Sequence, residues 1–164
     1  MQSRSSLLII TFSLMSVTWG ASALAEATHT VEQKPVLGLA SAMKLMETAR
    51  VYADAHHWPC AISVVDDGGW NLASVRMDGA PVVAGSDLAQ GKARTAALFK
   101  RPSDDLEKAV NGGRIAAVTA GLVMMKGGQP IKRNGQVIGG VGISADTPAH
   151  DDEIALAALA ALGD

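Results

Sequence analysis

The dipeptide Asn134-Gly135 constrains the fold more than any other feature of this sequence. It stands between two short segments, 131–133 and 136–138, that contain isoleucine and valine. Asn-Gly tolerates the positive φ angles of a type I′ turn, and this turn joins two neighbouring antiparallel strands. We therefore expect a β-hairpin here, so the sheet must be at least partly antiparallel.

The second strand of this hairpin is rich in glycine. Gly139, Gly140 and Gly142 all fall within the segment 137–144. Glycine weakens a strand, and it occurs there where the strand bulges or where another backbone or a ligand comes very close. Both arrangements remain open at this stage.

Periodicity and capping residues predict the other elements. Helices are expected over 36–57, over 86–100 with Ser86 as the cap, over 103–110, and from 148 to near the C-terminus. Strands are expected over 60–65, 70–77, 122–126, 131–133 and 137–144. The segment 115–125 is ambiguous between helix and strand, and its last part is taken as a strand because Gly127-Gly128 turns the chain. This order predicts an α+β fold with helices packed against an antiparallel sheet of about five strands.

The N-terminus has the pattern of a secretory signal peptide. Arg4 precedes the apolar run 7–17, and Ala23-Leu24-Ala25 has the small-x-small pattern of a cleavage site. The alternative is a membrane anchor, but serine and threonine interrupt the run, which is shorter than the ~20 residues of a spanning helix. We therefore expect export to the periplasm or the medium. The predicted parts are a signal peptide at 1–25, a flexible lead-in at 26–35 and a single domain at 36–164.

Composition argues against several classes of protein. The 14 basic and 16 acidic residues give a net charge of -2, and aromatic residues make up only 4%, so nucleic acid binding is not supported. The only cysteine, Cys60, cannot form an internal disulfide and opens an apolar segment, where we expect it to be buried. Neither a P-loop, nor a serine-hydrolase elbow, nor a His-Glu-x-x-His motif occurs in the sequence. The sequence therefore offers no standard signature of a nucleotide enzyme, a hydrolase or a structural zinc site.

Several segments, taken in order, resemble one known family. They are 64–69 (VVDDGG), 76–80 (RMDGA), 92–96 (KARTA), 127–131 (GGQPI), 135–144 (GQVIGGVGIS) and 151–155 (DDEIA). This pattern resembles the HbpS/GlcG-like family of haem-binding or haem-degrading proteins, which is related to the C-terminal domain of PduO. The resemblance implies an α+β domain that forms dimers or larger homo-oligomers, with haem as the cofactor. Ser144 is a candidate ligand contact, although Ala145 stands where the family usually has glycine.

The helix expected at 86–100 carries further candidate ligand contacts. A step of 100° per residue places Lys92, Thr95 and Phe99 within a stripe of roughly 60°. The Lys92 ammonium either reaches water from an apolar face or lies at the rim of an apolar pocket. At such a rim it would bind a haem propionate or another small carboxylate.

The remaining candidates are charged or imidazole side chains. Arg76 and Asp78 leave the second strand together, either as an ion pair of little energetic value or as ligand contacts. His56 and His57 close the first helix and are the candidate ligands of haem iron. Their alternative role is an ordinary one at a helix C-terminus, where a positive charge is favourable.

Three functions are consistent with these residues. The first is an exported haem- or tetrapyrrole-binding protein, in haem handling or degradation. The second is an enzyme that uses the same pocket for a small organic acid, with Lys92 or Arg76 as the anchor and Asp66 or Asp78 moving a proton. The third is a non-catalytic oligomeric binding module. The resemblance implies a homo-oligomer, and the composition and the signal peptide predict no nucleic acid partner and no membrane span after cleavage.

Overall fold

The computed structural model describes residues 33–160 and 162. The predicted signal peptide and most of the predicted lead-in lie outside these residues. Within the described part, no helix is both long enough and apolar enough to cross a membrane.

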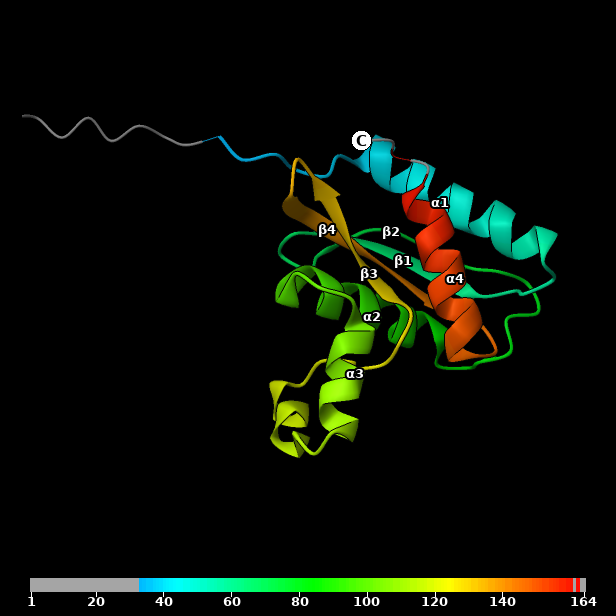
Figure 1. Ribbon diagram of the computed structural model, residues 1–164. Coiled ribbons are helices and arrows are strands. Elements are labelled where there is room, and N and C mark those ends of the chain that lie inside the picture. The colour runs from blue at the N-terminus through cyan, green and yellow to red at the C-terminus, as the bar shows by residue number, and fades with distance from the viewer. Residues whose placement is uncertain (1–32, 161, 163–164) are drawn as a thin grey trace, which may run out of the picture. The chain divides into compact units, whose positions relative to one another are not determined.

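The described chain alternates helices with short strands, as the α+β prediction requires. The helices are α1 (Leu39–Ala55), α2 (Gly85–Phe99), α3 (Ser103–Asn111), the 3-10 helix η1 (Ile115–Ala120) and α4 (Pro148–Leu159). The strands are β1 (Ala61–Asp66), β2 (Asn71–Arg76), β3 (Gly128–Arg133) and β4 (Gln136–Ser144). They form one sheet in the order β2-β1-β4-β3, and every neighbouring pair is antiparallel (Figure 1).

The predicted hairpin is confirmed. Asn134 and Gly135 have φ angles of 50° and 76°, as a type I′ turn requires, and they join β3 to β4. Two local predictions were wrong. The helix α2 begins at Gly85 with Ala84 at the cap position, so Ser86 lies inside its first turn.

The second wrong prediction is the strand at 122–126. Without it, the sheet has four strands. This segment is irregular and leads from η1 back to the sheet. The carbonyl groups of Val123 and Met125 accept hydrogen bonds from the hydroxyls of Thr95 and Ser103. Side chains of α2 and α3 therefore bind this backbone in place of a neighbouring strand.

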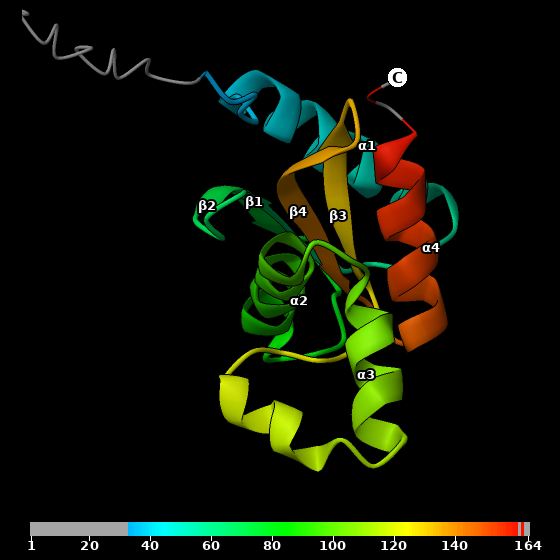
Figure 2. The same ribbon diagram turned by 60° about the vertical axis from the view of Figure 1, so that its left-hand side comes forward.

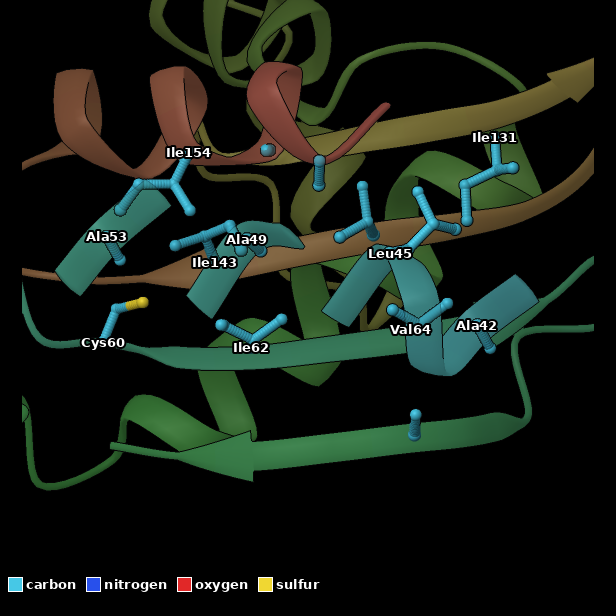
Figure 3. Packing of buried hydrophobic residues seen from close by; sticks show 14 of the residues in the cluster. Ala42, Leu45, Ala49, Ala53, Cys60, Ile62, Val64, Ile131, Ile143 and Ile154 are labelled. Carbon is cyan, nitrogen blue, oxygen red and sulfur yellow. The ribbon is translucent and has the colours of Figure 1, made fainter. Parts of the chain in front are cut away.

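Helices cover both faces of the sheet. Figure 2 shows α1 and α4 on one face and α2 on the other, while α3 and η1 extend away from the sheet. On the first face, α1 contributes the small residues Ala42, Ala49 and Ala53, all fully buried, which let it lie close to the strands. Figure 3 shows Ala49 near Ile62 and Ala42 near Val64, both residues of β1. Since apolar burial is the main favourable term in folding, this layer is the principal core.

The glycines of β4 are explained by the approach of α2. A Cβ atom at Gly142 would clash with the carbonyl oxygen of Ala89 and lie 2.5 Å from the nitrogen of Ala93. A Cβ atom at Gly140 would lie 3.1 Å from the nitrogen of Ala97. The close approach of another backbone therefore explains the glycines at 140 and 142. The predicted bulge is also present, because the register of β4 with β3 shifts by one residue between Val137 and Gly139.

Candidate functional site

Four rings stack in a row where α1 ends and α4 begins. The ring centroids of Tyr52 and His56 are 4.1 Å apart, and those of His56 and Trp58 are 4.9 Å apart. On the far side of Trp58, the ring of His150 is 3.7 Å away and nearly parallel, at 11°. We call Tyr52, His56, Trp58 and His150 the ring stack. The fold thus places His56, a predicted iron ligand, among rings that come from two distant parts of the sequence.

The imidazole of His56 is held in one tautomer. Its Nδ1 lies 2.8 Å from the carbonyl oxygen of Tyr52. Because a carbonyl oxygen can only accept a hydrogen bond, Nδ1 carries the proton, and Nε2 of the neutral ring keeps its lone pair. The residue is exposed. His56 therefore offers a nitrogen ligand from an oriented ring, as metal-binding histidines commonly do.

Two acidic residues hold the side chains of Tyr52 and His150 in place. The Nδ1 atom of His150 lies 2.7 Å from Oδ1 of Asp146, and this hydrogen bond lowers the pKa of the Asp146 carboxyl. The hydroxyl of Tyr52 donates to Oε1 of Glu153 at 2.6 Å, which raises the pKa of the Tyr52 phenol. The Tyr52–Glu153 contact joins α1 to α4, and the Asp146–His150 contact lies at the start of α4. The pairs Tyr52–His56 and Asp146–His150 have i, i+4 spacing that the sequence shows, whereas the contacts between α1 and α4 do not follow from spacing.

His57 has a different environment from His56. It follows the helix with a left-handed φ of 58°, and its backbone N–H donates to the carbonyl of Asp54 at 3.1 Å. Its side chain is exposed, and within the described residues its ring makes no hydrogen bond or stacking contact. The residue therefore ends the helix, in line with the ordinary role that the sequence left open.

Arg76 and Asp78 lie together at a pocket beside α1. The pocket has a volume of about 340 Å³ and is also lined by Arg50 and Asp54. The guanidinium of Arg76 donates to the carbonyl oxygen of Ala80 at 2.8 Å. Cations and carboxylates therefore face the same space, and an anion that enters would meet charges of both signs.

Contrary to the sequence prediction, Lys92 does not lie at a pocket rim or reach water. It was expected to reach water or the rim of a pocket, but it is only 1% exposed. Its Nζ lies 2.5 Å from Oδ2 of Asp151 and donates to the carbonyl of Ile143 at 3.0 Å. The other carboxylate oxygen of Asp151 accepts the backbone N–H of Ala145 at 2.5 Å. Lys92 joins α2, β4 and α4 in the interior, so it cannot anchor a carboxylate from solvent.

The environment of Asp151 also perturbs its protonation. Burial raises the pKa of its carboxyl, because loss of water outweighs the opposing hydrogen bonds from Lys92 and Ala145. The nearby Cys60 is fully buried, as predicted, and burial raises the pKa of its thiol to about 12. Neither group is open to solvent.

Thr95 and Ser144 are buried too, and Phe99 stands apart from them. The Thr95 hydroxyl lies 2.9 Å from the carbonyl oxygen of Gly91 and 2.8 Å from that of Val123. Ser144 pairs with Ala61 in the sheet and is 3% exposed. Phe99 is 37% exposed and lines a pocket beside α3 and η1. The predicted site residues therefore fall into a surface group, an interior group and a separate pocket.

Comparisons with known proteins agree on one family. The model of the family described as haem degrading protein HbpS-like matches residues 37–160. The protein GlcG of Escherichia coli is 41% identical over 116 residues, which are 70% of this chain and 85% of GlcG.

Solved structures give the same result. HbpS of Streptomyces reticuli, solved as a double mutant, has a TM-score of 0.77 and 28% identity, over 88% of this chain and 99% of that one. PduOC, solved as a complex with haem, has a TM-score of 0.71 and 30% identity, over 79% of this chain and 96% of that one. Both the sequence and the fold therefore place the chain among these proteins.

Proposed function

The chain belongs to the HbpS-like family, and from this membership we propose that it is a haem-binding protein. The match to the family described as haem degrading protein HbpS-like and the similarity to the haem complex of PduOC support this proposal. The observation on this structure that carries it is the His56 imidazole, which is exposed and has its Nδ1 proton bound to the Tyr52 carbonyl. The free Nε2 lone pair is the donor that haem iron takes from a histidine.

The residues around His56 fit an iron ligand. The rings of Tyr52 and Trp58 lie on either side of His56 along the ring stack, at 4.1 and 4.9 Å, and would limit its rotation. When bound, haem would supply an iron centre for redox or oxygen chemistry. The chain itself would bind and orient the group, and would tune the ligand through the hydrogen bond at Nδ1.

A cation for a propionate is available at the neighbouring end of β2. Arg76 is exposed and uses one arm of its guanidinium on the Ala80 carbonyl, so other N–H donors remain for a carboxylate. Asp54 and Asp78 line the same pocket and would oppose a second carboxylate. In this proposal Arg76 is therefore an anchor for one propionate only.

The proposal includes export and self-association. Export rests on the signal-peptide pattern of residues 1–25. Self-association rests on apolar side chains that face solvent in the single chain, which include Leu39, Met43 and Val51 of α1, each at least 46% exposed. Large exposed apolar surfaces commonly mark protein interfaces. A homo-oligomer in the periplasm or the medium is the state that we expect.

Haemin titration of the chain that starts at Glu26 tests the haem proposal. We expect a Soret band that differs from that of free haemin in position and intensity. His56→Ala should remove this difference, because it removes the oriented ligand. The matched variant His57→Ala should keep it, since His57 only ends the helix.

The outcomes separate the parts of the proposal. A spectrum equal to that of free haemin would refute haem binding by this chain. A shifted spectrum that survives His56→Ala but not His57→Ala would refute the ligand assignment alone. Circular dichroism of each variant shows whether the fold is retained, and size-exclusion chromatography with light scattering tests self-association.

A further inference from the structure

We infer that the pocket between the end of α2, α3 and η1 binds a small monocarboxylate with an apolar body. This pocket has a volume of about 260 Å³. Its apolar walls include Phe99, Leu106 and Met124, and its charged lining residues are Arg101 and Arg114. The inference goes beyond haem binding, because the ring stack belongs to α1, α4 and the segment before β1.

Small side chains create the space. Ala109 of α3 and Ala116, Ala117 and Ala120 of η1 line the pocket, where larger side chains would fill it. Ligand pockets for drug-sized molecules usually measure about 300–1,000 Å³. A space of about 260 Å³ therefore suits a ligand smaller than these and cannot enclose a tetrapyrrole.

The charge of the pocket selects an anion. Both charged lining residues are arginines, and no acidic residue lines the pocket. Within residues 33–160 and 162, neither Arg101 nor Arg114 takes part in an ion pair. The neighbouring cation Lys108 is instead paired with Asp104 at 2.6 Å. Two guanidinium groups without a carboxylate partner at an apolar space match a carboxylate that carries an apolar body.

Contacts within the pocket position one of the two cations. The guanidinium carbon of Arg101 lies 5.9 Å from the centre of the Phe99 ring, within the range of a cation–π contact. This contact holds the charge beside an apolar wall, where a bound carboxylate would be partly shielded from water. In the pocket beside Arg76, by contrast, Asp54 and Asp78 oppose an anion.

Isothermal titration calorimetry of the purified protein with sodium octanoate tests the inference, with octanol as the neutral analogue. Octanoate should bind at least about tenfold more tightly than octanol, because one hydrogen-bonded charge contact is worth this factor or more. The double variant Arg101→Gln/Arg114→Gln should bind octanoate at least about tenfold more weakly. The matched variant Arg133→Gln, at an exposed cation on the hairpin, should leave the affinity unchanged. Ala117→Leu should also weaken binding, since it fills the pocket.

Several results would overturn the inference. These are no binding of octanoate, equal binding of octanoate and octanol, or equal affinities of the double variant and Arg133→Gln. Haemin titration of the same double variant separates this site from the haem site. Its Soret band should match that of the unmodified protein, whereas displacement of haemin by octanoate would show that the pocket is part of the haem site.

Discussion

Replacement of Lys92 by methionine should destabilise the protein strongly. Methionine keeps much of the length of the side chain but removes the ammonium group that lies 2.5 Å from Asp151. Both side chains are almost completely buried, with 2% and 7% of their surfaces exposed. Removing one partner of such a buried pair leaves a charge without compensation, which costs about 3–5 kcal/mol. Against a total stability of about 5–15 kcal/mol, this loss is large but leaves a folded state to measure.

The destabilisation should depend on pH. Burial already raises the pKa of the Asp151 carboxyl, and loss of Lys92 removes a contact that opposes this rise. A carboxyl whose pKa is higher in the folded protein than in the unfolded chain takes up a proton on folding. Its contribution to stability is present below the unfolded pKa and is lost as pH rises through the folded pKa. The penalty of Lys92→Met should therefore be smaller at pH 4 than at pH 7.

Urea unfolding followed by circular dichroism measures these effects. The midpoint should fall while the slope with urea stays constant, because the same surface is exposed on unfolding. Lys108→Met is the matched control, since its ion pair with Asp104 has a lysine side chain that is 69% exposed. An exposed pair contributes about 0–1 kcal/mol. If Lys92→Met costs no more than Lys108→Met, the reasoning about the buried pair is refuted.

Three further predictions test other parts of the fold. Gly142→Ala should cost about 1–3 kcal/mol or more in urea unfolding, because its Cβ would press on the α2 backbone at Ala89; equal stability would contradict the close approach. The Cys60 thiol, buried and with a pKa of about 12, should react with a thiol reagent at pH 8 only after urea unfolds the protein, and fast labelling without urea would contradict its burial. Thr147→Ala should lower the free energy of unfolding by about 1 kcal/mol in thermal or urea unfolding, since the Thr147 side chain caps α4 by accepting the His150 N–H at 3.2 Å. Thr147→Ser keeps the hydroxyl and should therefore keep most of this stability; an equal loss in both variants would contradict the cap.

Local signals were sufficient to predict much of the fold. The Asn134-Gly135 turn depends only on the φ angles of two residues, so the hairpin could be predicted without tertiary information. Pro148 at the start of α4 is a similarly local signal. The glycines of β4 required more. Their presence predicted either a bulge or a close approach, and the structure contains both: β4 has one extra residue between Val137 and Gly139, and α2 packs against Gly140 and Gly142.

The burial of Lys92 could not be predicted from its own helix. A lysine on an apolar helical face is ordinarily expected to extend to water. Its partner Asp151 lies 59 positions later in the chain, in the first turn of α4, and its second acceptor is the Ile143 carbonyl of β4. The interaction forms only when three elements pack together, so it could not be predicted from the periodicity or spacing of residues. The same holds for the contact between Trp58 and His150 in the ring stack.

With a strand at 122–126, the pocket beside η1 could not be predicted. A strand there would have extended the sheet and placed Met124 next to another strand. Instead, the backbone at Val123 and Met125 is held by hydroxyls of α2 and α3, so Met124 lines the pocket with Phe99. The residues of η1 that follow Arg114 are almost all exposed, although all six of them are alanine or β-branched. Apolar residues that the core does not bury are available for a ligand, and because Arg101 and Arg114 lie beside them, we expect this ligand to be an anion.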